Sequence, residues 1–441
     1  MMANYAARRA ALMAQMLPGS VAILATAPEV ARNSDCDYPY RHDSYFYYLS
    51  GFTEPDSAVV LLAASATAPA RAILFCRAKN TEREIWDGFR HGPDAARASF
   101  GFDSAFPIEE LDVEMTRVLA DATAIYYALG GSLDAQVKVW LHNVRKKARS
   151  GVTAPAIAHD INGMLDAMRL LKDPQEQGLM RHAAAISSAA HVRAMRATRP
   201  GLHEYALEAE LLYEFRRSGA QFPAYSSIVA SGDNACTLHY SANNAVLKEG
   251  ELVLIDAGCE YAGYASDITR TLPVNGRFSR AQQALYELVL AAQQAALEMV
   301  RPGMPHSAIH EAALQVLAQG MLDLKLLERE KCGSVQDVIA DQAYLPFYMH
   351  GTSHWLGMDV HDVGAYRDTG APGKPWRALA PGMVLTVEPG IYVRPGADVP
   401  EQFWHTGIRI EDDVLVTPQG HEVFSTAPKS VAEIEQLMSQ D

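Results

Sequence analysis

Five residues in the second half of the chain have the types and the order needed to hold two metal ions: Asp256, Asp267, His354, Glu388 and Glu411. Each lies in a glycine-flanked segment whose pattern predicts a β-strand or a strand end. Carboxylates crowded into an apolar sheet cost free energy unless positive charge lies between them, and two divalent cations would offset that cost. Such a site can make hydroxide from water and polarise a carbonyl at neutral pH.

The ligand types also narrow the choice of metal. One imidazole and four carboxylates, with no thiolate, favour ions such as Mn²⁺ or Co²⁺ over structural Zn²⁺. Asp256 and Asp267 stand eleven residues apart, and Gly258 and Gly263 between them permit a hairpin that would bring the two carboxylates together. The alternative for Asp256 taken alone is a turn at the end of a strand.

Histidines gather in the run from His350 to Asp362, which also holds His354 and His361. The glycines of this run disfavour a helix, so we expect loop and strand there. One histidine is expected to ligate metal, and the others can hydrogen-bond a substrate. His239 is a further candidate, although a lone histidine can equally be structural.

Arg409 shares strand parity with Glu411 in the run Gly407-Ile408-Arg409-Ile410-Glu411, so both should face the same side. It could orient a ligand carboxylate, bind a substrate carboxylate, or form a surface salt bridge. The dipeptides His203-Glu204 and His310-Glu311 resemble the start of an HExxH zinc motif. Leucine stands where each second histidine should be, so we expect ordinary helix-surface residues there.

Composition places the chain among globular proteins, with 441 residues, 49% hydrophobic and 20% charged residues, and a formal charge of -14. The acidic balance argues against nucleic acid or an anionic membrane as partner. No apolar run approaches the roughly 18 residues of a membrane span. The five cysteines are scattered and form no CxxC pair, so we expect neither a disulfide framework nor a thiolate zinc site. We expect a cytoplasmic protein.

The length predicts two domains, 1–172 and 173–441, with the boundary near Lys172-Asp173-Pro174. Asp before Pro fits the start of a helix. The predicted helices and strands are these: strands over Ser20–Ala27, Ala58–Ala64 and Ala72–Cys76, a loop over Arg32–Tyr40, and helices over Ala135–Arg149, Gln175–Arg196, Glu204–Ser218 and Ser307–Leu324.

The second domain contains an internal echo. The run Gly250 to Gly258 aligns with the run Gly382 to Gly390, with glycine six residues before the carboxylate and two after it. Each run is followed by a second carboxylate, Asp267 in one half and Glu411 in the other. Helix–strand–strand units repeated twice predict a pseudo-two-fold domain with its metals on the symmetry axis.

The ordered ligand set resembles the pita-bread metallopeptidases, which include methionine aminopeptidase, prolidase and aminopeptidase P. The segments His350 to Asp362, Val387 to Gly390 and Gly407 to Asp412 match this family, and the stretch from Arg32 to Pro55 resembles the N-terminal domain of aminopeptidase P. The resemblance implies an α/β (α+β) architecture, with a C-terminal pita-bread domain after a smaller mixed α/β domain.

The resemblance also implies a proline-specific aminopeptidase that acts on Xaa-Pro-Xaa peptides with two Mn²⁺, or Co²⁺ or Zn²⁺ in vitro. Asp267 and Glu411 would bridge the metals, Asp256 would complete one shell, and His354 and Glu388 the other. A hydroxide between the metals would attack the scissile carbonyl. The expected roles of the other residues are as follows: Glu388 as proton acceptor, His239 and His361 at the carbonyl or tetrahedral intermediate, and His350 in substrate positioning.

Proline selectivity calls for an apolar, aromatic wall, because a Xaa-Pro bond has no N–H and carries a rigid ring. Tyr392 is the candidate in the same domain, and Arg409 is a further substrate-binding candidate. By resemblance, Trp86 and Asp35 reach a neighbouring subunit's site in a homodimer or homotetramer. Two alternatives remain: a prolidase that acts on Xaa-Pro dipeptides, and a non-enzymatic pita-bread protein that binds peptides or histones.

Overall fold

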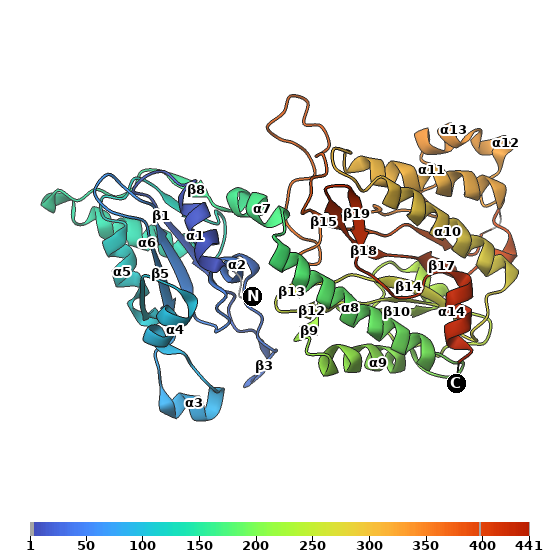
Figure 1. The fold of residues 1–441 in the computed structure, drawn as a ribbon, viewed down its shortest axis with the longest axis horizontal. Helices are drawn as coiled ribbons and strands as arrows, with labels where there is room; N and C mark the ends of the chain where they lie inside the picture. The colour runs from blue at the N-terminus through green and yellow to red at the C-terminus, as the bar shows by residue number, and fades with distance from the viewer. Residues whose placement is uncertain (1–3, 397, 441) are drawn as a thin grey trace. The chain divides into compact units, whose positions relative to one another are not determined.

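The chain folds into two compact units, and the computed structural model describes residues 4–396 and 398–440 of it. The division falls between the units Met1–Met168 and Arg169–Asp441. Both units mix helices and strands (Figure 1), so the α/β expectation is confirmed. Among the described residues, none of the helices has the length and apolar character of a membrane-spanning segment.

The N-terminal unit is built on one six-stranded sheet with the order β6-β5-β4-β1-β7-β8. The central strands are almost entirely buried, as their unbroken apolar runs require. The strands are β1 (Val21–Ala25), β4 (Ala58–Leu62), β5 (Arg71–Cys76), β6 (Ser104–Pro107), β7 (Ile125–Tyr127) and β8 (Ala158–Asp160). The helices of this part are α1 (Tyr5–Met13), α2 (Ser44–Ser50), α3 (Thr81–Asp87), α4 (Gly92–Phe100), α5 (Leu111–Val118), α6 (Asp134–Arg145) and α7 (Asn162–Leu170).

The three strands and the helix predicted for this unit are present with shifted ends: β1 and β4 are shorter than predicted, β5 is one residue longer, and α6 begins one residue earlier and ends four residues earlier. The predicted loop Arg32–Tyr40 was wrong in part, because it overlaps a short exposed hairpin of β2 (Ala31–Asn33) and β3 (Cys36–Asp37). A polar segment can pair with itself without entering a core, and sequence polarity does not reveal that pairing.

Two long helices open the C-terminal unit, α8 (Pro174–Ala197) and α9 (Glu204–Arg217). The side chain of Asp173 accepts hydrogen bonds from the backbone of Gln175 and Glu176, and the Glu176 side chain reaches back to the N–H of Asp173. This capping box satisfies the free N–H groups of the first turn, with Pro174 at the first helical position. The predicted helix start near Asp173-Pro174 is therefore correct.

The strands of this unit form small sheets that repeat in two halves. In the first half, β11 pairs with β14 antiparallel, and in the second β15 pairs with β18 antiparallel. The strands are β9 (Phe222–Pro223), β10 (Ile228–Ser231), β11 (Leu252–Asp256), β12 (Cys259–Tyr261), β13 (Tyr264–Ala265), β14 (Thr269–Pro273), β15 (Val384–Val387), β16 (Gly390–Val393), β17 (Thr406–Arg409), β18 (Asp412–Thr417) and β19 (Gly420–Val423). The sequence similarity between the runs Gly250 to Gly258 and Gly382 to Gly390 thus corresponds to equivalent strand pairs in the two halves.

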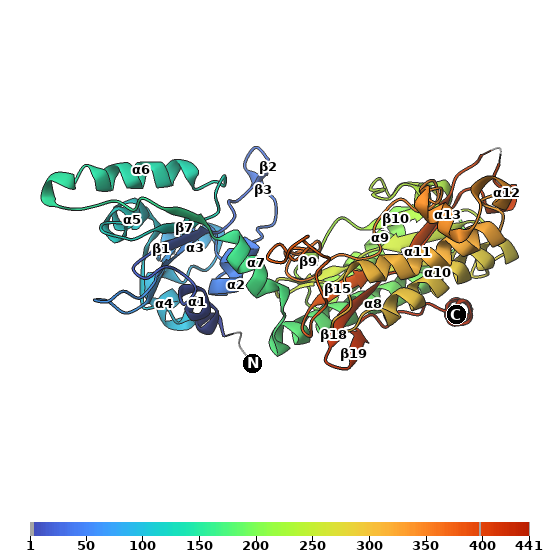
Figure 2. The same ribbon diagram turned by 90° about the horizontal axis from the view of Figure 1, so that it is seen from above.

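Each half also brings a pair of helices. Helix α8 packs against α9, and α10 (Arg280–Glu298) packs against α11 (Ser307–Asp323), as Figure 2 shows for the second pair. A helix matching α11 was predicted, whereas α10, which packs on β15, β16 and β17, was not. The remaining helices are α12 (Arg329–Cys332), α13 (Val335–Ala340) and α14 (Val431–Met438).

Candidate metal centre

The four predicted carboxylate ligands stand at equivalent places in the two halves. Asp256 ends β11, and Glu388 directly follows β15. Asp267 lies two residues before β14, and Glu411 lies one residue before β18. Because each pair of strands is antiparallel, the end of one strand meets the start of the other, and all four carboxylates come to one place.

A tight hairpin of β12 and β13 brings Asp267 back beside Asp256. A Cβ atom on Gly258 would lie 1.8 Å from the carbonyl oxygen of Ser266, so only glycine permits this close approach. The hydroxyl of Tyr225 then lies 2.5 Å from Oδ1 of Asp256 and 2.6 Å from Oδ1 of Asp267. The predicted hairpin is present, and one phenol spans both carboxylates.

A cavity of about 280 Å³ lies where these carboxylates meet. Nine of the predicted site residues line it: His239, Asp256, Asp267, His350, His354, His361, Glu388, Arg409 and Glu411. Tyr392 is buried and does not line the cavity, but its hydroxyl contacts His350, which does. Asp35 and Trp86 belong to the N-terminal unit, where both are exposed.

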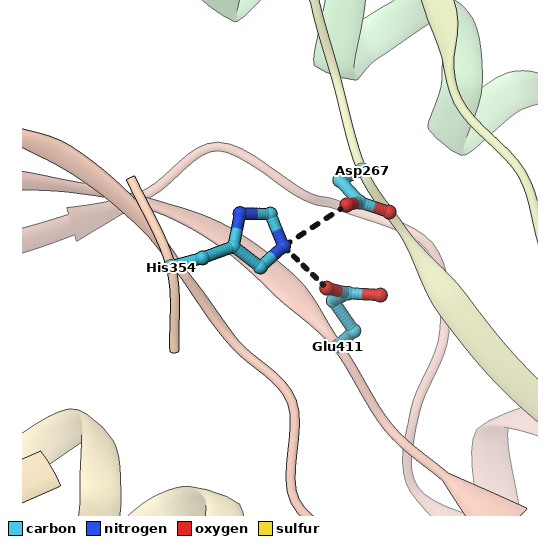
Figure 3. Close-up of side chains that lie close together, drawn as sticks. All are labelled: Asp267, His354 and Glu411. Atoms are coloured by element: carbon cyan, nitrogen blue, oxygen red, sulfur yellow. Dashed lines mark ion pairs between the residues drawn. The ribbon is translucent and has the colours of Figure 1, made fainter. Parts of the chain in front are cut away.

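His354 faces three of the carboxylates through one ring nitrogen. Its Nε2 lies 3.4 Å from Asp267 and 4.0 Å from Glu411, the two contacts drawn in Figure 3. The same nitrogen lies 3.6 Å from Glu388. Its Nδ1 donates to the backbone oxygen of Trp355 at 3.0 Å, which orients the ring and leaves Nε2 toward the carboxylates. Ligand atoms of Asp267, His354 and Glu411 all lie within 4.8 Å of one another. That arrangement suits a metal-ligating imidazole.

Burial makes the charged forms of these carboxylates costly in the absence of a cation. It raises the pKa of Asp256, raises that of Glu388 to about 7, and raises that of Glu411 well above its ordinary value. Neighbouring carboxylates add to the shift in each case. The group is therefore poised to take up positive charge.

His354 and Asp267 form a favourable ion pair within this group. Burial alone would raise the pKa of Asp267, but the bond from His354 brings it below its ordinary value. Burial would lower the pKa of His354, and its acidic neighbours instead raise that pKa to about 9. A proton on His354 thus neutralises part of the negative charge of the buried carboxylates. A divalent cation would neutralise more of it, so the donor set fits metal ions.

A second hydrogen-bonded chain runs along the cavity wall from Arg409. Its Nη2 lies 2.5 Å from Oδ2 of Asp256, and its Nη1 donates to the Tyr392 hydroxyl at 3.0 Å. That hydroxyl lies 2.8 Å from Nε2 of His350, whose Nδ1 lies 2.7 Å from the oxygen of Gly351. Arg409 is therefore no surface salt bridge, since it is buried and orients a predicted ligand carboxylate.

Three further side chains, none of them predicted, contact the predicted ligands: Tyr225, Thr269 and Asp413. Thr269 donates to Oε2 of Glu411 at 2.7 Å, and Asp413 accepts from the backbone N–H of Asp267 at 3.0 Å. Thr269 is two residues after Asp267, and Asp413 is two residues after Glu411. Side chains two residues apart on a strand face the same side, so this spacing could have indicated both residues. Nothing in the sequence around Tyr225 points to its role.

The loop after His361 is held by a buried ion cluster. Asp362 pairs with Arg169 at 2.6 Å and with Lys172 at 2.9 Å, and these three side chains are almost completely buried. Asp359 accepts a further bond from Arg169 at 2.8 Å. The cluster ties the start of the C-terminal unit to the residue next to His361.

Two protein-family models together match most of the chain. Residues 178–418 match the metallopeptidase family M24, and residues 5–126 match the aminopeptidase P N-terminal domain. The first match contains all five predicted ligands. The second covers most of the N-terminal unit, including Asp35 and Trp86.

Named relatives and solved structures align over nearly the whole length. The chain is 44% identical to an Xaa-Pro aminopeptidase of Escherichia coli over 98% of this chain and 96% of the relative. It is also 44% identical to one of Haemophilus influenzae, with the same coverage. A structure of Pseudomonas aeruginosa aminopeptidase PepP superposes with a TM-score of 0.95 and 50% identity, over 99% of this chain and 97% of that one. The predicted resemblance and the predicted pita-bread architecture are thereby confirmed.

Proposed function

This chain belongs to the metallopeptidase family M24, and we propose that it is an aminopeptidase that removes the first residue from peptides with proline in second position. The convergence of Asp267, His354 and Glu411 within 4.8 Å carries the proposal, because these three residues could hold a metal ion and all of them line the cavity. The names of the full-length relatives, Xaa-Pro aminopeptidases, support the choice of substrate.

The proposed cofactor is a pair of Mn²⁺ ions, with Asp267 and Glu411 as bridging ligands. Asp256 would serve one ion, while His354 and Glu388 would serve the other. The hard oxygen donors and the single imidazole support this choice. When bound, the two ions lower the pKa of water and polarise the scissile carbonyl.

The chain's own residues then handle protons and developing charge. Glu388 is the proposed proton acceptor, because its carboxylate lines the cavity beside the other proposed ligands and a positioned carboxylate can serve as a general base. His239 and His361 line the same cavity, where imidazoles can hydrogen-bond the scissile carbonyl and the tetrahedral intermediate. Arg409 holds the carboxylate of Asp256 in place.

Proline would lie against His350, whose ring is oriented by Tyr392 and Gly351. Both ring nitrogens of His350 have partners, so this ring offers a rigid wall to the pyrrolidine. The proposed assembly is a homodimer or homotetramer in which Asp35 and Trp86 complete a neighbouring site. The indole of Trp86 is 83% exposed, which supports a role at an interface.

We also propose a cytoplasmic location. All five cysteines are free, and three of them are buried. Free buried thiols are common in proteins of reducing compartments.

Product analysis with a tripeptide tests the proposal. The metal-free protein, loaded in turn with Mn²⁺, Co²⁺ and Zn²⁺, is incubated with Arg-Pro-Pro, Arg-Ala-Pro and the dipeptide Arg-Pro. We expect free arginine from Arg-Pro-Pro, with Mn²⁺ giving the highest rate, and much slower release from the other two peptides. Preference for the dipeptide would instead identify a prolidase, and intact peptides with folded, metal-loaded protein would refute the proposal.

A further inference from the structure

A second cavity of about 540 Å³ lies beside the metal centre and shares His350, Gly351 and Ser353 with it. We propose that this cavity is the subsite for the third residue of the peptide substrate, and that it selects an apolar side chain, above all an aromatic one. The inference rests on the proposed function, since that reaction defines which residue of the peptide is third.

The walls of this cavity are largely rings. Tyr344, Tyr348, Tyr366 and Trp376 line it, together with Leu345 and the two imidazoles of His306 and His310. A volume of this size lies within the range of pockets that hold small ligands. Aromatic walls favour an aromatic guest, because ring pairs gain energy beyond the area that they bury.

The loop that carries Tyr366 and Trp376 is anchored at its base. The N–H of Arg377 donates to the oxygen of Tyr366 at 2.8 Å, and the N–H of His306 donates to the oxygen of Arg377 at 2.9 Å. The guanidinium of Arg367 lies 3.8 Å from the centre of the Trp376 ring. The cavity therefore has a built wall on this side.

The opposite wall is anchored through Thr352. Its hydroxyl lies 2.8 Å from Nδ1 of His310 and 2.5 Å from the hydroxyl of Tyr348. His310 thus serves this cavity, and the resemblance of His310-Glu311 to a zinc motif has no counterpart among the described metal-type clusters.

Exposure and polarity at the cavity indicate an apolar occupant. Leu345 is 40% exposed and Trp376 is 38% exposed, and both would lose contact with water against a guest. Burial lowers the pKa of His306 and of His310, so both are neutral at physiological pH.

The order of the cavities gives the direction of the peptide. A third cavity, of about 360 Å³, meets the metal centre at Asp256 and Asp267, where carboxylates can hold the substrate's amino group. The peptide would then run past His350. Since an extended residue advances at most about 3.3–3.6 Å, the residue after a proline at His350 reaches the cavity that shares this ring.

The test compares Ala-Pro-Gly, Ala-Pro-Leu and Ala-Pro-Phe with the metal-loaded protein, and takes kcat/KM ratios within each variant. We expect Ala-Pro-Phe to exceed Ala-Pro-Gly by about tenfold in the unaltered protein, because an apolar side chain is buried. Trp376→Ala and Leu345→Ala should each reduce that ratio at least about threefold. Tyr205→Ala, which removes a 52% exposed tyrosine on α9, is the matched control and should keep it.

Ratios measured within one variant cancel differences in folded fraction or metal content. A ratio near one in the unaltered protein, with all three peptides cleaved, would overturn the subsite and leave the aminopeptidase proposal standing. An unchanged ratio in both cavity variants would also overturn it. If the metal-loaded protein cleaved none of the peptides, the proposed function itself would fall, and the subsite with it.

Discussion

The hydroxyl of Tyr392 lies 2.8 Å from Nε2 of His350 and joins that ring to Arg409, which donates to the same hydroxyl at 3.0 Å. Tyr392 is buried and stands behind the cavity wall, so it is a positioning residue that acts through His350. Proline recognition is therefore expected to depend on a hydrogen bond as well as on an aromatic surface.

Tyr392→Phe should weaken selectivity for proline while the ring packing is kept. It leaves Nε2 of His350 and one N–H of Arg409 without their partner, at a cost of about 1–3 kcal/mol. We expect KM for Ala-Pro-Ala to rise roughly tenfold, with a smaller change in kcat, and the preference over Ala-Ala-Ala to shrink. Equal loss of kcat for both peptides, with KM unchanged, would argue for a general structural role instead.

Glu388→Ala should abolish turnover, because it removes a proposed ligand and the proposed proton acceptor together. Loss of general base catalysis alone lowers kcat roughly 10²–10⁴-fold. Glu388→Gln separates the two roles, since the amide oxygen can still ligate but cannot accept the proton. Metal content and kcat should be measured on both variants, and near-normal activity in either would show that Glu388 is not the base.

Removal of metal should destabilise the protein. Without a cation, the buried carboxylates Asp256, Glu388 and Glu411 repel one another, and binding to the folded state alone adds stability by mass action. We expect the Tm to fall after chelation and to recover with Mn²⁺. Recovery should be lost in Asp267→Asn/Glu411→Gln, and a chelator-insensitive Tm would contradict a metal centre.

Stability should fall in mild acid through His191. Its fully buried ring lies with Nε2 3.0 Å from the oxygen of Ala257, and burial lowers its pKa to about 4. In the unfolded chain this histidine takes up a proton near pH 6.5, whereas in the folded chain it does not. The free energy of unfolding is therefore highest above pH 6.5 and decreases as the pH falls toward 4. At pH 5.5 the free energy of unfolding is lower by roughly 1 kcal/mol.

Urea unfolding of the metal-free protein at pH 7.5 and 5.5 measures this effect, with His191→Gln as the comparison. The variant is less stable at neutral pH but should lose about 1 kcal/mol less on acidification. Identical pH dependence in both proteins would show that His191 is not the group that titrates.

Gly258→Ala should damage the metal centre directly. The added methyl group would lie 1.8 Å from the Ser266 oxygen, so the hairpin that returns Asp267 to Asp256 must open. We expect a lower Tm and metal content well below that of the unaltered protein. Gly178→Ala in α8 meets no atom within 4 Å and is the matched control, with stability unchanged or raised by up to about 1 kcal/mol.

Local sequence determined much of this protein. Apolar runs and glycines marked the strands that bear Asp256 and Glu388, and Asp173-Pro174 marked the start of α8, because pleat, turn and cap are decided within a few residues. The ligand types and their order indicated metal chemistry and, through resemblance, the family. The polarity of Arg32–Tyr40 predicted a loop, but part of this segment forms the hairpin at Ala31–Asp37.

Tertiary structure decided the rest, because contacts between residues distant in the chain leave no mark on local pattern. The placement of Tyr225 between Asp256 and Asp267 depends on three separate segments. Whether Arg409 met solvent, substrate or Asp256 depended on which strand lay beside it. The cavity between α11 and the loop of Trp376 likewise exists only because backbone bonds pin that loop to the helix start.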